Sequence, residues 1–159
     1  MIAVPLTDND LVVAHRAAML RVRRARETHA YNRYDARGDI DALNVTGCLG
    51  ELAVARYLRA PWVAATPRFA HQPTDVAHVQ VRTTPLGNGR LLVHPADPDD
   101  QPFVLARTHR APVVELVGWI LGADAKRDDW WRALQPGRPC YVVPNGALAP
   151  LDTLPGVTP

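Results

Sequence analysis

The spacing of apolar side chains in the first 60 residues is helical. One set of side chains recurs at alternating intervals of four and three residues, which places them on one face of a helix. They are Leu11, His15, Ala18, Val22 and Ala25. This predicts a helix over residues 9–31, a loop over residues 32–46, where Asn, Asp, Arg and Gly are mixed, and a second helix over residues 46–59. Gly47 and Gly50 in the second helix allow another part of the chain to approach closely.

After residue 60 the period becomes that of β-strands. Short apolar or alternating runs are separated by turn residues. Strands are predicted over residues 62–66, 76–84, 90–94, 103–107, 113–121 and 141–143. Asn88 and Gly89 predict a hairpin that pairs the second of these strands with the third. A short helix is predicted over residues 124–134.

This order of elements predicts one α+β domain over residues 1–159. Its central mixed β-sheet is flanked by helices, and two N-terminal helices precede a strand meander. We divide it into an N-terminal helix and loop (1–44), a core (45–145) and a tail (146–159). A hydrophobic fraction of 47% and a charged fraction of 21% are typical of a globular protein and exclude a disordered, collagenous or coiled-coil chain.

The sequence predicts no membrane-crossing helix and no secretory signal. No apolar run approaches the roughly 20 residues that a membrane-crossing helix needs. Residues 1–10 lack a basic segment followed by an apolar core, so a secretory signal is not expected. We therefore expect a cytoplasmic protein without a membrane partner.

The basic residues are almost all arginines. Lys and Arg total 18 against 16 Asp and Glu, and the only lysine is Lys126. A GC-rich genome explains such a bias, and phosphate binding by guanidinium groups is the alternative. Exposed arginines of the first two helices are the candidates for contacts with a nucleic-acid backbone, against the alternative of a solvated helix face. They are Arg16, Arg23, Arg24 and Arg56.

Four residues form a candidate catalytic group. Glu51 lies in the second helix and Asp75 directly before the strand over residues 76–84, while Gln80 and Arg82 are two apart on that strand and share a face. Asp75 is five residues from Gln80, an odd spacing that points the two side chains to opposite faces of a regular strand. Asp75 joins the group only if the chain bends or bulges around residues 77–78.

Two other charged features have no evident link to this group. Asp97, Asp99 and Asp100 form an acidic cluster that is typical of a solvated turn. Nothing in the sequence ties Lys126 to the four candidate residues.

The four residues and their order resemble the PD-(D/E)XK nuclease superfamily. In that family a helix contributes a Glu, a strand contributes an Asp, and an acid-x-Lys motif follows. Residues 47–58 resemble the helix with Glu51, residues 73–76 the element with Asp75, and residues 79–84 the strand with Gln80 and Arg82. Later runs, at residues 103–105 and 115–120, resemble the closing strands of its small phage-type members. The resemblance extends over about residues 45–145 and implies a restriction-endonuclease-like fold.

The resemblance implies metal-dependent hydrolysis of DNA by a phage- or mobile-element-encoded protein that acts inside the host cell. A homodimer is the expected assembly. Mg²⁺ or Mn²⁺ would be held by the carboxylates of Glu51 and Asp75, with the Gln80 amide oxygen and the Val81 carbonyl as further ligands. The metal would supply hydroxide and relieve charge on the phosphate. Arg82 would face the scissile phosphate.

Two positions depart from the family pattern. Gln80 replaces the acid, and Arg82 replaces the lysine. A guanidinium group stays protonated and cannot act as a general base, although it can hold a phosphate. The alternative is therefore a catalytically inactive nuclease-fold protein that serves as a DNA-binding or protein-interaction module. A third possibility is a structural phage protein that binds neither metal nor DNA.

Overall fold

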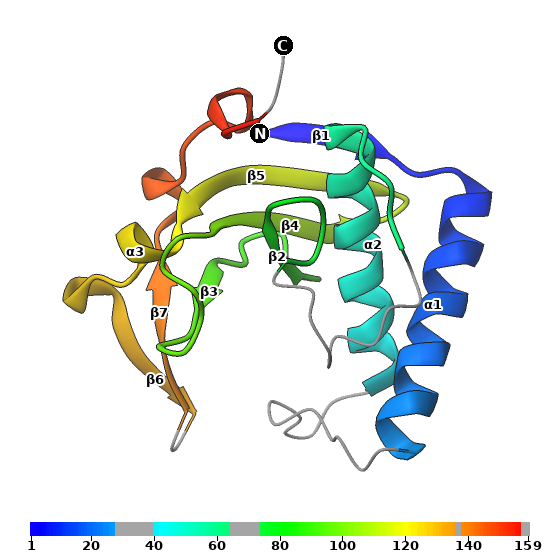
Figure 1. The fold of residues 1–159 in the computed structure, drawn as a ribbon, viewed down its shortest axis with the longest axis horizontal. Helices are drawn as coiled ribbons and strands as arrows, with labels where there is room; N and C mark the ends of the chain where they lie inside the picture. Colours follow the sequence, from blue (N-terminus) through cyan, green and yellow to red (C-terminus); the bar gives the residue numbers. More distant parts are fainter. Residues whose placement is uncertain (28–39, 64–73, 136–137, 157–159) are drawn as a thin grey trace.

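The computed structural model describes residues 1–27, 40–63, 74–135 and 138–156 (Figure 1). The described chain is an α+β structure with a mixed sheet, as the sequence predicts. The helices are α1 (Asp8–Glu27), α2 (Ile40–Leu58) and the short α3 (Gly122–Ala125). The strands are β1 (Ile2–Pro5), β2 (Gln80–Thr84), β3 (Leu91–Val93), β4 (Pro102–Arg110), β5 (Val113–Leu121), β6 (Trp131–Gln135) and β7 (Arg138–Val143). In the part of the chain described, no helix has both the length and the apolar character needed to cross a membrane.

The strands form two sheets. The first has the order β1-β5-β4-β2, in which β2 runs parallel to β4 and the other neighbours are antiparallel. The second is antiparallel with the order β3-β7-β6. Helix α2 packs between α1 and the first sheet, and the two long helices lie side by side in Figure 1. This arrangement brings α2, which carries Glu51, against β2, which carries Arg82.

Strand β4 is covered on both faces. Val104 and Ala106 belong to the core beneath α1 and α2, whereas Phe103 and Leu105 belong to a second core against β3 and β7. Because side chains alternate along a strand, one β4 strand contributes to both cores. Its side chains from Pro102 to Thr108 are consequently all buried.

The predicted hairpin through Asn88 and Gly89 is wrong in its pairing. Strand β2 pairs with β4, and β3 leaves to pair with β7. The reason is burial, since Leu91 and Val93 are both fully buried in the second core.

Four other differences from the predicted elements occur. The helix over residues 124–134 is wrong, because α3 ends at Ala125 and β6 begins at Trp131, where Trp131 pairs with Tyr141 in the strand register and their rings lie 4.9 Å apart. Aromatic pairs across strands stabilise a sheet. Helix α2 begins six residues earlier than predicted, and β1 was not predicted. The strand over residues 62–66 is not formed at 62 and 63, and its other residues lie outside the described chain.

Gly50 marks a close crossing of α2 over β2. A Cβ atom at residue 50 would lie 2.0 Å from Oγ1 of Thr83, whereas a Cβ at Gly47 would meet nothing within 4 Å. The close approach predicted from the two glycines therefore occurs at Gly50 and involves a side chain of β2. Helix α2 therefore approaches β2 most closely one residue before Glu51.

Gly50→Ala should lower the free energy of unfolding by about 1–3 kcal/mol, because the added methyl group forces the helix and the strand apart. Gly47→Ala is the matched control and should raise it by about 1 kcal/mol, because alanine favours a helix. Urea unfolding followed by circular dichroism measures both. Equal effects of the two substitutions would contradict the close crossing.

Candidate active site

Asp75 reaches the site through a tight turn. Val76 and Val79 form an isolated antiparallel bridge, and Ala77 between them has a φ of 50°, in the left-handed region. The bend that the sequence required around residues 77–78 is therefore confirmed. Oδ2 of Asp75 accepts a hydrogen bond of 2.9 Å from the backbone N–H of Val81, which fixes the carboxylate beside β2.

Val81 also presents its carbonyl on this side. The N–H and C=O of one residue in an extended strand point to the same side. Since the Val81 N–H points to Asp75, its carbonyl lies on the Asp75 side of β2 and away from β4. This carbonyl is the one that the sequence-based hypothesis names as a metal ligand.

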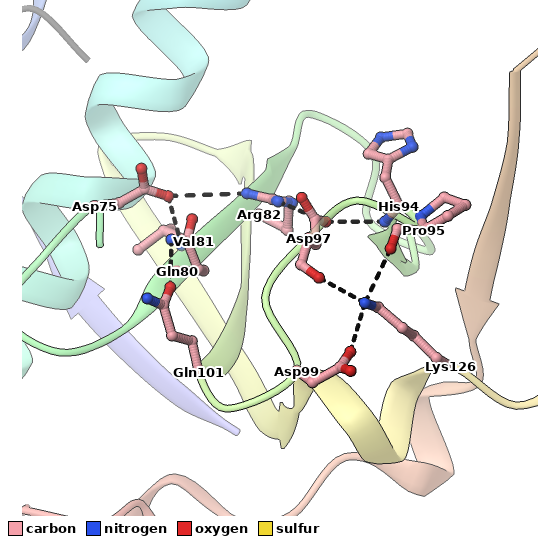
Figure 2. Close-up of polar contacts among 10 residues, drawn as sticks. All are labelled: Asp75, Gln80, Val81, Arg82, His94, Pro95, Asp97, Asp99, Gln101 and Lys126. Carbon is pink, nitrogen blue, oxygen red and sulfur yellow. Dashed lines mark hydrogen bonds and ion pairs between the residues drawn. The ribbon is translucent and has the colours of Figure 1, made fainter. Parts of the chain in front are cut away.

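Arg82 lies between two carboxylates (Figure 2). Its Nη2 donates to Oδ2 of Asp97 at 2.8 Å, and its Nη1 lies 3.9 Å from Oδ2 of Asp75. The guanidinium also lies over the ring of Phe103, 5.0 Å from the centroid. Arg82 is thus oriented by its surroundings and remains partly exposed, which is what a phosphate-binding arginine requires.

Glu51 is buried and paired. Both of its carboxylate oxygens accept hydrogen bonds from Arg21, at 2.9 and 2.7 Å, and Nε1 of Trp62 donates to Oε2 at 3.2 Å. Its side chain is only 3% exposed. Burial lowers the pKa of Arg21, but the hydrogen bonds and charge of Glu51, together with the charge of Asp75, outweigh it and raise the pKa. Arg21 therefore stays protonated beside the buried Glu51 carboxylate.

Gln80 is directed to a neighbouring turn. Its Nε2 donates to Oε1 of Gln101 at 2.7 Å. This contact orients the Gln80 amide. Gln80 directly precedes Val81 on β2, the strand that also carries Arg82. The structure thus brings Asp75, Val81 and Arg82 together and places Gln80 next to them along β2, whereas it pairs Glu51 with Arg21 of α1.

The donors fit an oxygen-ligating divalent cation in part. Mg²⁺ is commonly bound through one or two carboxylates, with water and substrate phosphate completing its shell. Asp75 and the Val81 carbonyl meet this requirement. Both oxygens of Glu51 are taken by Arg21. No group of three or more His, Cys, Asp or Glu residues within the described ranges could hold a metal.

The four candidate phosphate-binding arginines do not share one surface role. Arg16 and Arg23 are exposed and seven residues apart on α1, so they lie on one face, and Arg23 pairs with Glu27 at 2.8 Å. Arg24 is also exposed. Arg56 donates to Asp10 at 2.6 Å and so ties the end of α2 to the start of α1.

Asp10 is the centre of that junction. Its Oδ2 accepts from the N–H of Thr7, whose Oγ1 accepts from the N–H of Asp10, a reciprocal capping arrangement. Burial raises the pKa of Asp10, but hydrogen bonds from Arg56 and Thr7 outweigh it, and the pKa lies below its ordinary value of 3.8.

Asp10→Asn should therefore lower the free energy of unfolding by about 1–2 kcal/mol at neutral pH. A carboxylate with a lowered folded pKa stabilises above its unfolded pKa and loses this contribution as the pH falls through the folded value. The difference between the wild type and Asp10→Asn should thus shrink below about pH 4. Urea unfolding at pH 7, 5 and 3 measures it, with Asp8→Asn as an exposed control from the same helical turn. A difference that stays constant across this range would contradict the assignment.

Three residues that pair with the candidate residues or with their neighbours were not predicted from the sequence. Arg21 binds Glu51, Asp97 binds Arg82, and Lys126 binds the carbonyl of Asp97. Arg21 follows Ala14 by seven residues and Ala17 by four, so it lies on the buried face of α1, and this spacing could have identified it. Asp97 was assigned to a solvated turn. Lys126 was placed in a helix that does not form.

His94 closes the network beside Asp97. Its backbone N–H donates to Oδ2 of Asp97 at 2.9 Å. Burial lowers the pKa of the His94 imidazole, and Arg82 lowers it further against the opposing charge of Asp97. The imidazole is therefore neutral at neutral pH.

Comparisons with models of protein families, with curated proteins and with solved structures give no match. What this site can do must therefore follow from its own geometry.

Proposed function

We propose that the protein is a metal-dependent, endonuclease-like hydrolase of DNA with a restriction-endonuclease-like core of the PD-(D/E)XK type. The observation that carries the proposal is the position of Asp75. A tight turn places its carboxylate on the backbone of β2 and 3.9 Å from Arg82. In metal-dependent hydrolysis of a phosphodiester, a carboxylate can hold the metal and a neighbouring cation can hold the phosphate.

In this proposal Asp75 and the Val81 carbonyl would hold Mg²⁺ or Mn²⁺, with Glu51 and the Gln80 amide oxygen as further ligands. When bound, the metal would supply the attacking hydroxide and neutralise charge on the phosphate. Arg82 stays protonated and holds the phosphate that is to be cleaved. The exposed Arg16, Arg23 and Arg24 contact the flanking backbone, and Arg56 contributes from the end of α2.

A second copy of the chain is part of the proposal. Cleavage of both strands of a duplex is served by two sites related by a two-fold axis, and a two-fold dimer is the commonest assembly of one chain. Such an enzyme acts inside the cell that holds its DNA.

One observation favours a second candidate function, an inactive nuclease-fold module that binds DNA or protein. Arg21 takes both oxygens of Glu51. A carboxylate held in this way stabilises the core and is less available to a metal. Together with Arg82 in the place of the family's lysine, it is compatible with a site that binds phosphate without cleaving it.

Incubation with supercoiled plasmid and with branched DNA separates the two candidates. The hydrolase should nick or linearise DNA with Mg²⁺ or Mn²⁺ and leave it intact with a chelator. Retarded migration of DNA without cleavage would support the binding module. Neither cleavage nor binding of DNA would contradict both the hydrolase and the DNA-binding module, and would leave a module that binds protein.

A further inference from the structure

The only lysine of the chain holds a turn in place. Lys126 follows directly after α3, and its Nζ donates to three oxygens of the 95–99 turn, as Figure 2 shows. These are the carbonyls of Pro95 at 3.0 Å and Asp97 at 2.5 Å, and Oδ1 of Asp99 at 2.5 Å. The Lys126 side chain is 17% exposed, so most of it is withdrawn from water.

The backbone around this contact is tightly packed. The N–H of Gly122 donates to the carbonyl of Gln101, and the N–H of Ala123 donates to the carbonyl of Asp99, both at 2.9 Å. A Cβ at residue 122 would lie 2.0 Å from the carbonyl oxygen of Pro98. The start of α3 therefore rests on the turn, and this contact directs Lys126 into it.

The same turn carries Asp97, which holds Arg82. Oδ2 of Asp97 accepts both from Nη2 of Arg82 at 2.8 Å and from the N–H of His94 at 2.9 Å. The distance from Arg82 to Asp75 is longer, 3.9 Å. Asp97 thus draws the guanidinium away from direct pairing with Asp75, while keeping it beside that carboxylate.

We propose that Lys126 is a positioning residue, which clamps the 95–99 turn so that Asp97 holds Arg82 in the direction of an incoming phosphate. The Lys126 charge pairs with the carboxylate of Asp99, and its Nζ also binds two backbone carbonyls of the turn. When Lys126 is replaced, the three oxygens of the turn lose the hydrogen bonds from its Nζ. Arg82 then moves from Asp97 to pair with Asp75. The role of Arg82 toward phosphate rests on the proposed function; the clamp itself does not.

The clamp is tested without substrate, by the ¹⁵Nε–¹H resonance of Arg82, assigned from its loss in Arg82→Lys. Lys126→Met should shift or broaden this resonance. Lys126→Arg should restore it, and Arg127→Met should leave it unchanged. Arg127 is the matched control because it is the neighbouring cation and its side chain is 60% exposed. An Arg82 resonance that is the same in Lys126→Met and the wild type would overturn the proposal.

Asp97→Asn provides a second route to the same result. It weakens the link to Arg82 without altering Lys126, so it should reproduce the spectral change. The double variant Lys126→Met/Asp97→Asn should add nothing to it, because both substitutions break one chain of contacts. Additive changes would overturn the proposal. If Lys126→Met folds poorly, Lys126→Gln takes its place in the same comparison.

The effect on function is a second measurement. Lys126→Met should reduce the rate of DNA cleavage about 10- to 100-fold, as for other residues that orient a reacting group, while changing DNA affinity less than about twofold. Lys126→Arg should recover the rate. A rate equal to that of Arg127→Met would overturn the role in positioning. If the wild type cleaves no DNA, the proposed hydrolysis fails, and the Arg82 resonance still decides whether the clamp exists.

Discussion

Asp75→Asn should abolish DNA cleavage, reducing its rate by at least about 100-fold, while the variant still folds and still binds DNA. The amide oxygen of asparagine can accept the hydrogen bond from the N–H of Val81, so the turn is retained. What is lost is the negative charge that would hold the metal. The measurement is plasmid cleavage with Mg²⁺ and with Mn²⁺, together with DNA affinity measured in the presence of a chelator.

Asp100→Asn is the matched control, because Asp100 is an exposed acid in the turn before β4. It also removes one negative charge and should leave the rate of cleavage within about twofold, as expected for an exposed surface site. Cleavage by Asp75→Asn at the wild-type rate would eliminate the proposed site.

Arg21→Met should lower the free energy of unfolding by about 3 kcal/mol, because it leaves the buried carboxylate of Glu51 without its charged partner. Trp62 would remain as a donor to Glu51, but one neutral hydrogen bond does not replace two charge-assisted ones. Chemical unfolding at neutral pH measures this loss. Arg23→Met, which breaks the exposed pair of Arg23 with Glu27, should cost less than about 0.5 kcal/mol.

The double variant Arg21→Met/Glu51→Gln distinguishes the ion pair from other packing by Arg21. Removing both charges should restore most of the lost stability, since the destabilisation comes from the unpaired carboxylate. If Glu51 is also a metal ligand, the double variant should recover its fold but not the rate of cleavage. A double variant as unstable as Arg21→Met would show that Arg21 stabilises by packing alone.

The sequence predicted those parts of the site that depend on local spacing. The odd interval between Asp75 and Gln80 required a bend, and the structure has one at Ala77. The close crossing at Gly50 was expected from the absence of a side chain there. These features depend on short-range sterics, which a sequence displays directly.

The missed features depend on contacts between distant segments. Residues 131–135 have no strong local preference against a helix, and the pairing of Trp131 with Tyr141 decides for a strand. Lys126 reaches Asp97 and Asp99 only because α3 is short and rests on their turn. Tertiary contacts of this kind override local propensity, and the spacing of residues along the sequence does not predict them.

Strand β4 also has a consequence for folding cooperativity. It gives alternate side chains to the two cores, so neither core can open without withdrawing support from the other. Arg82 reaches across this boundary, because it lies on β2 beside Asp75 and over the ring of Phe103, which belongs to the second core. The polar network and both cores therefore form one cooperative unit, in which partial unfolding of the second sheet also disassembles the site.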